Sequence, residues 1–162
     1  MPLASTKTGY SIVIRDRRQR YLPGVRGWYK IRRRDTTEAV VGAITGTVAR
    51  PQALILGRRD EEGVLRAVAR STLLHPAQAR RIGAQLTPAR PGHAWEGVKF
   101  TTSWRSRAPL DVTLVEPDQV AEISIDTAQA GGVWRHPGRV ARLRADMAPA
   151  EVPMVGKSTP AG

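Results

Sequence analysis

The chain has 162 residues, of which 41% are hydrophobic, so it can form one domain of ordinary size with a packed core, and wholesale disorder is excluded. Its 26 Lys and Arg against 14 Asp and Glu give a formal net charge of +12 at pH 7, which favours a polyanionic partner, with nucleic acid ahead of an anionic membrane. The absence of cysteine excludes disulfides and thiolate metal sites, and no segment has the apolar length of a signal peptide or a membrane span, so we expect a soluble cytoplasmic protein.

The chain begins with a segment that is predicted to be basic and β-rich. It contains an expected strand at 10–16 ("YSIVIRD"), a basic loop at 17–27 and an alternating strand at 28–34 ("WYKIRRR"). Alternation puts Trp28, Lys30 and Arg32 on one face of the second strand, where they form a row of cations beside an aromatic ring. Because guanidinium groups suit phosphate oxygens, this row favours polyanion binding; the alternative is an ordinary solvated basic surface.

The rest of the chain is predicted to be mainly β. Turn residues separate five expected strands, at 38–49, 53–59, 63–71, within 118–128, and at 138–146. One helix is expected over 75–86, because Pro76 suits a first helical turn and helix formers follow it. Five short strands with one helix between the third and fourth is the order of a five-stranded OB-fold barrel, whose face and loops bind oligonucleotides.

Alternation also divides the last two strands into faces. It predicts Ala141 and Leu143 on one face of the final strand, opposite Arg142 and Arg144. Asp146 could orient one of these guanidinium groups. The second cationic candidate therefore consists of Arg135, Arg139, Arg142 and Arg144, with the polar outer face of a barrel-closing strand as the alternative.

Other chemistry-bearing residues show no catalytic or metal-binding pattern. The three histidines have no metal-ligand spacing, at positions His75, His93 and His136. The nearby acids fit a solvated strand edge better than a metal pair: Glu116, Asp118, Glu122 and Asp126. No phosphate-cradling glycine loop or Ser/His/Asp arrangement is found, so these residues indicate a polyanion binder without a visible catalytic centre.

Three stretches, taken in their order along the chain, nevertheless resemble a known enzyme family. "RYLPGVRGWYKIRRRDTTEAVVGAITGT", "LDVTLVEPDQVAEISIDTA" and "GVWRHPGRVARLRADM" together resemble the C-terminal part of actinobacterial-type ATP-dependent DNA ligases, over about residues 10–147. The resemblance implies three parts: the end of a nucleotidyltransferase domain at 1–35, an OB-fold domain at 36–147 and a disordered tail at 148–162. It also implies a bacterial protein that associates with the nucleoid when it binds DNA.

The resemblance implies roles for particular residues. Nucleotide phosphates would be contacted by Lys30, Arg32, Arg135, Arg142, Arg144 and Asp146. The charge and the aromatic residues of the segment 15–34, rather than the resemblance, predict the DNA contacts: Arg15, Arg17, Arg18, Arg20, Arg26, Trp28, Arg33 and Arg34. The family's OB domain would pivot at a hinge formed by Arg34 and Asp35. The expected partner is nicked duplex DNA, together with a separately encoded nucleotidyltransferase half.

The chain departs from the family pattern where the chemistry is done. It has no Lys-x-Asp-Gly motif, so the lysine that would take up AMP is absent and no catalytic set is complete. Tyr10 and Arg15 stand where the resemblance predicts a metal-supporting Glu and a Lys, and Met147 follows Asp146 where a Lys is common. ATP and Mg²⁺ are implied by the family alone. We expect this chain to bind neither by itself, to have no metal site and to perform no ligation unaided.

Three other interpretations remain. The first is a free-standing OB-fold nucleic-acid-binding module unrelated to ligation, which would prefer single strands. The second is a complete enzyme with an unrecognised nucleophile, which the missing lysine and metal-binding acid disfavour. The third is a truncated or degenerate gene, since residues 1–9 do not resemble the family.

Overall fold

The computed structural model describes residues 11–14, 29–32, 35–102, 106–125, 129–130, 133–134 and 136–156, and only the backbone of 11–14, 29–32, 35 and 129–130. The chain divides into two units, Met1–Arg34 and Asp35–Gly162. In the first unit, β1 (Ser11–Ile14) and β2 (Tyr29–Arg32) form an antiparallel pair in which Ile12 lies opposite Ile31. Strands at both of these places were predicted.

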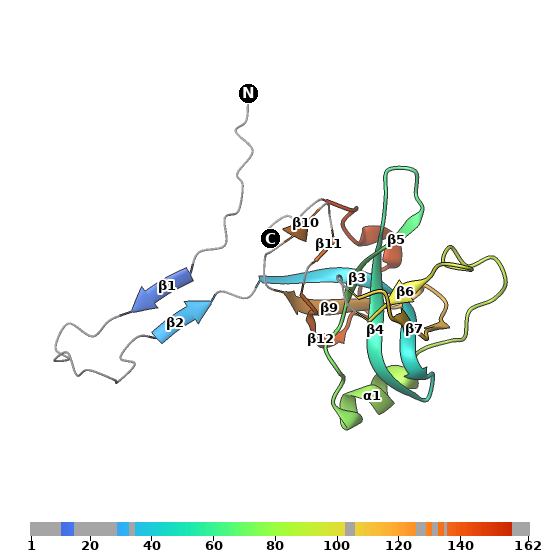
Figure 1. Cartoon of the computed structure of the whole chain (residues 1–162), viewed down its shortest axis with the longest axis horizontal. Coiled ribbons are helices and arrows are strands. Elements are labelled where there is room, and N and C mark those ends of the chain that lie inside the picture. The colour runs from blue at the N-terminus through green and yellow to red at the C-terminus, as the bar shows by residue number, and fades with distance from the viewer. Residues whose placement is uncertain are drawn as a thin grey trace. The chain divides into compact units, whose positions relative to one another are not determined.

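The second unit is built on one antiparallel sheet (Figure 1). Its strand order is β12-β9-β3-β4-β5. The strands are β3 (Asp35–Thr47), β4 (Arg50–Arg59), β5 (Leu65–Arg70), β9 (Val120–Ile125) and β12 (Arg139–Leu143). The helix α1 (Pro76–Gly83) lies between β5 and β9 in sequence. The predicted mainly β class and the position of the helix after the third of the five strands are therefore confirmed.

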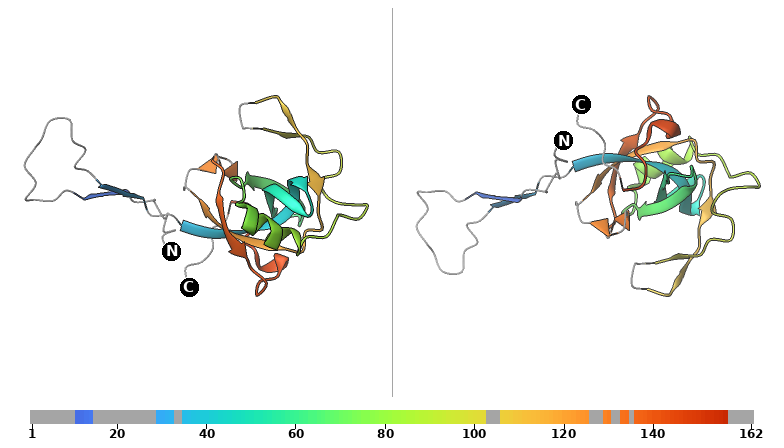
Figure 2. Two further views of the ribbon diagram at one scale, coloured as in Figure 1. Left: turned by 90° about the horizontal axis from the view of Figure 1, so that it is seen from below. Right: turned by 90° about the horizontal axis from the view of Figure 1, so that it is seen from above.

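Short elements decorate this sheet. They are β6 (Phe100–Thr101), β7 (Pro109–Leu110), β8 (Thr113–Leu114), β10 (Gln129–Ala130), β11 (Val133–Trp134) and the 3₁₀ turn η1 (Pro149–Glu151). β6 pairs with β7, β10 pairs with β11, and β8 adds to β3. Figure 2 shows that the long connection from α1 to β9, which carries β6 and β7, projects from one side of the sheet.

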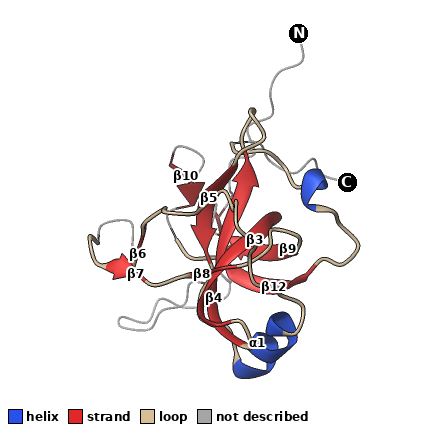
Figure 3. Ribbon diagram, turned by 90° about the vertical axis from the view of Figure 1, so that its right-hand side faces the viewer, coloured by secondary structure: helices blue, strands red, loops and turns tan. Residues whose placement is uncertain are grey.

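The helix closes one end of the curved sheet (Figure 3). Pro76 occupies its first turn, where the missing N–H costs nothing, and Arg80 and Arg81 lie in its last turn, where cations favour the helix dipole. Ala79, Ile82 and Gly83 are its buried residues. Nowhere in the described part of the chain does a helix reach the length and apolarity needed to cross a membrane.

The barrel is partly open. Among the described residues, an isolated parallel bridge joins Ser71, which follows β5, to Gly138, which precedes β12. There the N–H of Thr72 donates to the Gly138 carbonyl at 2.8 Å, and the N–H of Gly138 donates to the Arg70 carbonyl at 3.0 Å. This incompletely closed, curved sheet is compatible with the predicted five-stranded OB-fold barrel, an architecture that is itself partly open.

Both faces of the central strands are covered, which explains their long apolar runs. The interior core includes Leu54, Leu56 and Ile123, and Ile82 of α1 packs into it. A second cluster on the other face includes Val40, Ile55 and Trp95. Because β3 and β4 are buried on both sides, their sequences read as continuous hydrophobic stretches rather than as strict alternation.

Trp95 anchors the long connection to this second face. Its ring lies where side chains on Gly42 and Gly57 would be, since a Cβ on Gly42 would lie 2.4 Å from the Trp95 ring and one on Gly57 would lie 2.8 Å from it. The indole Nε1 donates to the Leu65 carbonyl at 2.9 Å. The two glycines thus leave a slot in the sheet for one tryptophan ring. The ring of Phe100 packs edge-to-face against it, with 5.5 Å between the ring centroids.

Two predictions about the end of the chain require correction. A β-bulge between Val140 and Arg142 makes Ala141 an extra, exposed residue, so Val140 and Leu143 face Ile123 and Ala121 in place of the predicted Ala141–Leu143 face. Residues 149–156 of the tail are packed, contrary to the prediction of disorder there, and the rest of the predicted tail lies outside the described residues. η1 forms there, Val152 is buried in the second core cluster, and the N–H of Val155 donates to the Arg59 carbonyl at 3.0 Å.

Candidate nucleic-acid interface

The end of β12 forms a compact cluster of arginines and acids. The Arg144 guanidinium donates two hydrogen bonds to the Asp146 carboxylate, from Nε to Oδ1 at 2.8 Å and from Nη2 to Oδ2 at 2.8 Å. Its third nitrogen, Nη1, donates to Oε1 of Glu38 on β3 at 3.2 Å and lies 3.8 Å from Oε2 of Glu122. All three nitrogens of this guanidinium therefore face carboxylates.

Arg142 belongs to the same cluster but is more open. Its Nε donates to Oε2 of Glu122 at 2.9 Å, and its side chain is 62% exposed, against 22% for Arg144. Within the described residues, its terminal nitrogens have no hydrogen-bond partner. Of the two arginines, Arg142 is the one whose fork can reach a phosphate without first releasing a carboxylate.

The electrostatics of the cluster follow from this pairing. Hydrogen bonds from Arg144 are the main reason that the pKa of Asp146 falls to about 2, and hydrogen bonds with Asp146 are the main reason that the pKa of Arg144 is raised. Two guanidinium groups face three carboxylates, so the cluster carries no excess positive charge for a nucleotide triphosphate. Within the part of the chain that the structure describes, no three His, Asp or Glu side chains could hold a metal ion together.

The lowered pKa of Asp146 predicts a specific pH dependence of stability. Asp146→Asn should lower the melting temperature near neutral pH, and the difference from the parent should disappear as pH falls from about 4 to about 2, where the parent carboxylate is protonated too. The measurement is thermal unfolding followed by circular dichroism at several pH values. Asp111→Asn is the matched control, because Asp111 is exposed and makes no ion pair within the described residues. A constant difference down to pH 2 would contradict the prediction.

A buried arginine lies next to this cluster. Arg58 of β4 is only 2% exposed, and its Nε and Nη2 donate to the Glu38 carbonyl at 3.0 and 2.8 Å, while Nη2 also bonds the Thr37 hydroxyl. Its guanidinium carbon lies 4.7 Å from the centre of the Trp134 ring. Burial lowers the pKa of Arg58 to about 10, and the charge of Glu38 opposes that shift. Arg58 is therefore charged at neutral pH and connects the cluster to β11.

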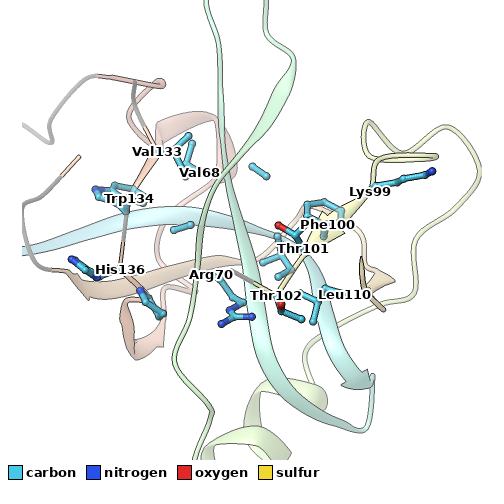
Figure 4. A pocket seen from close by; sticks show the side chains of 14 residues that line it. Val68, Arg70, Lys99, Phe100, Thr101, Thr102, Leu110, Val133, Trp134 and His136 are labelled. Carbon is cyan, nitrogen blue, oxygen red and sulfur yellow. The ribbon is translucent and has the colours of Figure 1, made fainter. Parts of the chain in front are cut away.

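A groove of about 280 Å³ lies over β5, and Trp134 is one of the residues that line it. Its floor is β5 with Ile55 of β4, and its two walls are the segment 133–137 and the β6–β7 pair (Figure 4). Its basic lining residues are Arg70, Lys99 and His136, and none of the described residues that line it is acidic.

The structure brings together only some of the residues predicted to form a site. Arg142, Arg144 and Asp146 form one cluster as described above. Lys30 and Arg32 lie in β2, of which the backbone alone is described, and Asp35 likewise begins β3. The remaining predicted positions lie outside the described residues: Arg15, Arg17, Arg18, Arg20, Arg26, Trp28, Arg33, Arg34 and Arg135.

Several residues of these sites were missed by the sequence analysis. Arg58 had a usable signal, because it continues the i, i+2 pattern of Leu54 and Leu56, whose side chains are fully buried. Glu122 was interpreted as strand-edge solvation, but it pairs with Arg142. Arg70 had no comparable signal, since the groove combines side chains from four separate parts of the chain.

Comparison with known proteins adds a relationship at the level of fold. No protein-family model and no curated protein matches this chain. Among solved structures it is similar to the ligase domain of LigD from M. tuberculosis, with a TM-score of 0.58 and 23% identity over 88% of this chain and 46% of that one. A mycobacterial DNA ligase D complexed with ATP and MES also matches, with a TM-score of 0.48 and 25% identity over 84% of this chain and 44% of that one. The chain thus spans about half the length of these ligase structures and shares its fold with part of the LigD ligase domain.

Proposed function

We propose that this chain is the C-terminal OB-fold part of an ATP-dependent DNA ligase and that it binds nicked duplex DNA. The observation that carries the proposal is the fold shared with the LigD ligase domain along 88% of the chain. The order of the three ligase-like stretches in the sequence supports the same assignment. The proposed setting is the bacterial cytoplasm, in association with the nucleoid.

The distribution of charge supports DNA as the partner. Within the described residues, several arginines outside the groove make no ion pair and are available to the phosphates of a duplex: Arg50, Arg80, Arg81, Arg107 and Arg139. Among the same described residues, five acids form ion pairs with Arg66, Arg90, Arg142 and Arg144, namely Glu38, Asp60, Glu116, Glu122 and Asp146. Contacts between such free cations and phosphates release counterions, which gives both affinity and a steep dependence on salt.

The proposed chain binds DNA but does not ligate it alone. Ligation requires a lysine that forms a covalent bond to AMP, and the sequence has no Lys-x-Asp-Gly motif to supply it. A separate nucleotidyltransferase half would have to provide that lysine and the metal-binding acids. Lys30 and Arg32 would then face the nucleotide phosphates, and Arg142 is the member of the β12 cluster that is free to join them.

The proposal is tested by fluorescence anisotropy with labelled nicked, intact and single-stranded DNA at several salt concentrations. Tighter binding to the nicked duplex than to the intact duplex supports a retained ligase role. Tighter binding to the single strand than to either duplex identifies a free-standing nucleic-acid-binding module instead. Failure to bind any of the three at low salt contradicts the proposal.

A salt titration tests the contribution of the basic N-terminal strand. Lys30→Ala with Arg32→Ala should flatten the slope of log affinity against log salt by about one to two units, since each neutralised phosphate contributes roughly −0.9. The double variant Arg80→Ala, Arg81→Ala removes the same charge from α1 and should change the slope less. An unchanged slope in the first variant would show that β2 does not contact the DNA backbone.

A further inference from the structure

The groove between β11 and the β6–β7 pair has chemistry that duplex binding does not use. Arg70 extends from its floor, His136 lies on one wall, and Lys99 begins the other wall (Figure 4). Neither Arg70 nor Lys99 makes an ion pair within the described residues. The rim therefore carries unneutralised positive charge around a surface with no acid among its described lining residues.

The inside of the groove is apolar and partly aromatic. Phe100 and Leu110 lie opposite each other in the β6–β7 register, and both line the groove. Phe100 is only partly buried, and the edge-to-face packing of its ring with Trp95 at 5.5 Å holds the wall against the sheet. A flat apolar group with an anionic edge matches this combination, because the ring offers a stacking surface and the rim cations offer partners for a phosphate.

The size of the groove restricts what can occupy it. A volume of about 280 Å³ is just below the roughly 300–1,000 Å³ of pockets that enclose a drug-sized ligand, so it suits one nucleotide rather than a longer segment. A base inside a duplex has both faces covered by its neighbours and cannot stack on a protein ring unless it leaves the helix. An unpaired nucleotide has no such restriction.

We propose that this groove binds an unpaired nucleotide of a DNA strand, with its base against Phe100 and its phosphate near Arg70. The inference rests on the proposed function, because it places the groove on a protein bound at a nick. It extends that function by assigning a site for a single-stranded flap or overhang at the break. Phosphate contacts by other surfaces would hold the paired part of the same DNA.

The test compares a labelled nicked duplex with the same duplex carrying a short single-stranded thymidine flap at the nick. The flap should strengthen binding by about 5- to 150-fold, the range expected for stacking of one base. Arg70→Gln and Phe100→Leu should each remove most of this gain while leaving affinity for the flush nicked duplex within about twofold. Arg80→Gln, which removes one charge from α1 outside the groove, should leave the gain intact.

Each result separates the inference from the proposed function. If the chain prefers nicked over intact duplex but the flap adds nothing, or if the groove variants keep the full gain, the inference is overturned and the proposed function stands. If the chain binds the nicked and the intact duplex equally well, the proposed function is contradicted, whatever the effect of the flap. Circular dichroism melting checks that both variants fold.

A second measurement uses the parent chain and photocrosslinking with iododeoxyuridine in the flap. The crosslink should label the tryptic peptide that begins at Phe100. Labelling confined to other peptides would overturn the inference even if a variant were unstable.

Discussion

Replacing Trp95 with alanine is expected to lower the free energy of unfolding by about 3–5 kcal/mol, the usual cost of removing a buried tryptophan. The side chain is 3% exposed, and its ring fills the slot above Gly42 and Gly57. The variant also loses the hydrogen bond from Nε1 to the Leu65 carbonyl. Urea unfolding monitored by circular dichroism measures the change. Because Trp95 anchors the long connection, amide hydrogen exchange should also accelerate around β6 and β7.

Two controls isolate the slot from general loss of apolar surface. Val98→Ala in the same connection removes a side chain that is 47% exposed and should change stability by less than about 0.5 kcal/mol. Gly42→Ala should destabilise the parent, since its Cβ would lie 2.4 Å from the Trp95 ring, but should be tolerated when Trp95 is already alanine. Additive effects of the two substitutions would show that the ring does not occupy the slot.

Arg58→Met is expected to lower the free energy of unfolding by about 2–3 kcal/mol, because it leaves buried oxygens of Thr37 and Glu38 without this donor. The loss is smaller than the sum of the broken bonds. Burial of the guanidinium is itself unfavourable, as the lowering of its pKa to about 10 shows, and methionine removes that cost. Denaturant unfolding at pH 7 measures the difference.

The neighbouring residue supplies the control for Arg58. Arg59 is exposed, and within the described residues its side chain makes one hydrogen bond, to the Gly63 carbonyl at 3.0 Å, so Arg59→Met should change stability by less than about 0.5 kcal/mol. Arg58→Lys should be intermediate, because it keeps the charge but not the fork that reaches two acceptors. Equal effects at 58 and 59 would contradict a special role for the buried guanidinium.

The sequence predicted the elements of this fold well where local patterns decide them. The meander of β3, β4 and β5 and the helix at Pro76 follow from runs of β-forming residues, turn residues between them and a proline at a helix start. The point at which the two ends of the sheet meet could not be predicted in the same way. It is set by the bridge between Ser71 and Gly138, which joins strands that are distant in sequence.

Errors arose where one residue changes the meaning of a pattern. The bulge at Ala141 shifts the alternation of β12 by one position, and no feature of the residues around it announces an extra residue. Val152 lies in a segment whose Pro, Ala and Gly content is typical of disorder, yet it is buried against the outer face of the sheet. Burial on both faces of a sheet is a tertiary property that composition does not report.

In the candidate sites, too, local sequence could indicate some of the neighbours, while other neighbours are brought together by folding alone. Arg142, Arg144 and Asp146 are neighbours in sequence, so a pattern could group them. Their acidic partners Glu38 and Glu122 lie on other strands, and without these partners the charge balance of the cluster could not be predicted. The groove has no local signature, because Arg70 and Phe100 become neighbours of one surface through folding.

The double pairing of β3 has a consequence for the order in which this unit assembles. From Val40 onward β3 pairs with β4, its immediate successor in the chain, whereas Asp35–Val40 pairs with β9, which is far away in sequence. Closing a short loop costs less chain entropy than closing a long one, so the β3–β4–β5 meander is expected to form early and to wait for β9. Arg58 can then reach Glu38 within the meander itself, while Arg144 arrives only with β12. The arginine–acid cluster is accordingly a late product of folding, completed after the strand that carries Glu38 has already been set.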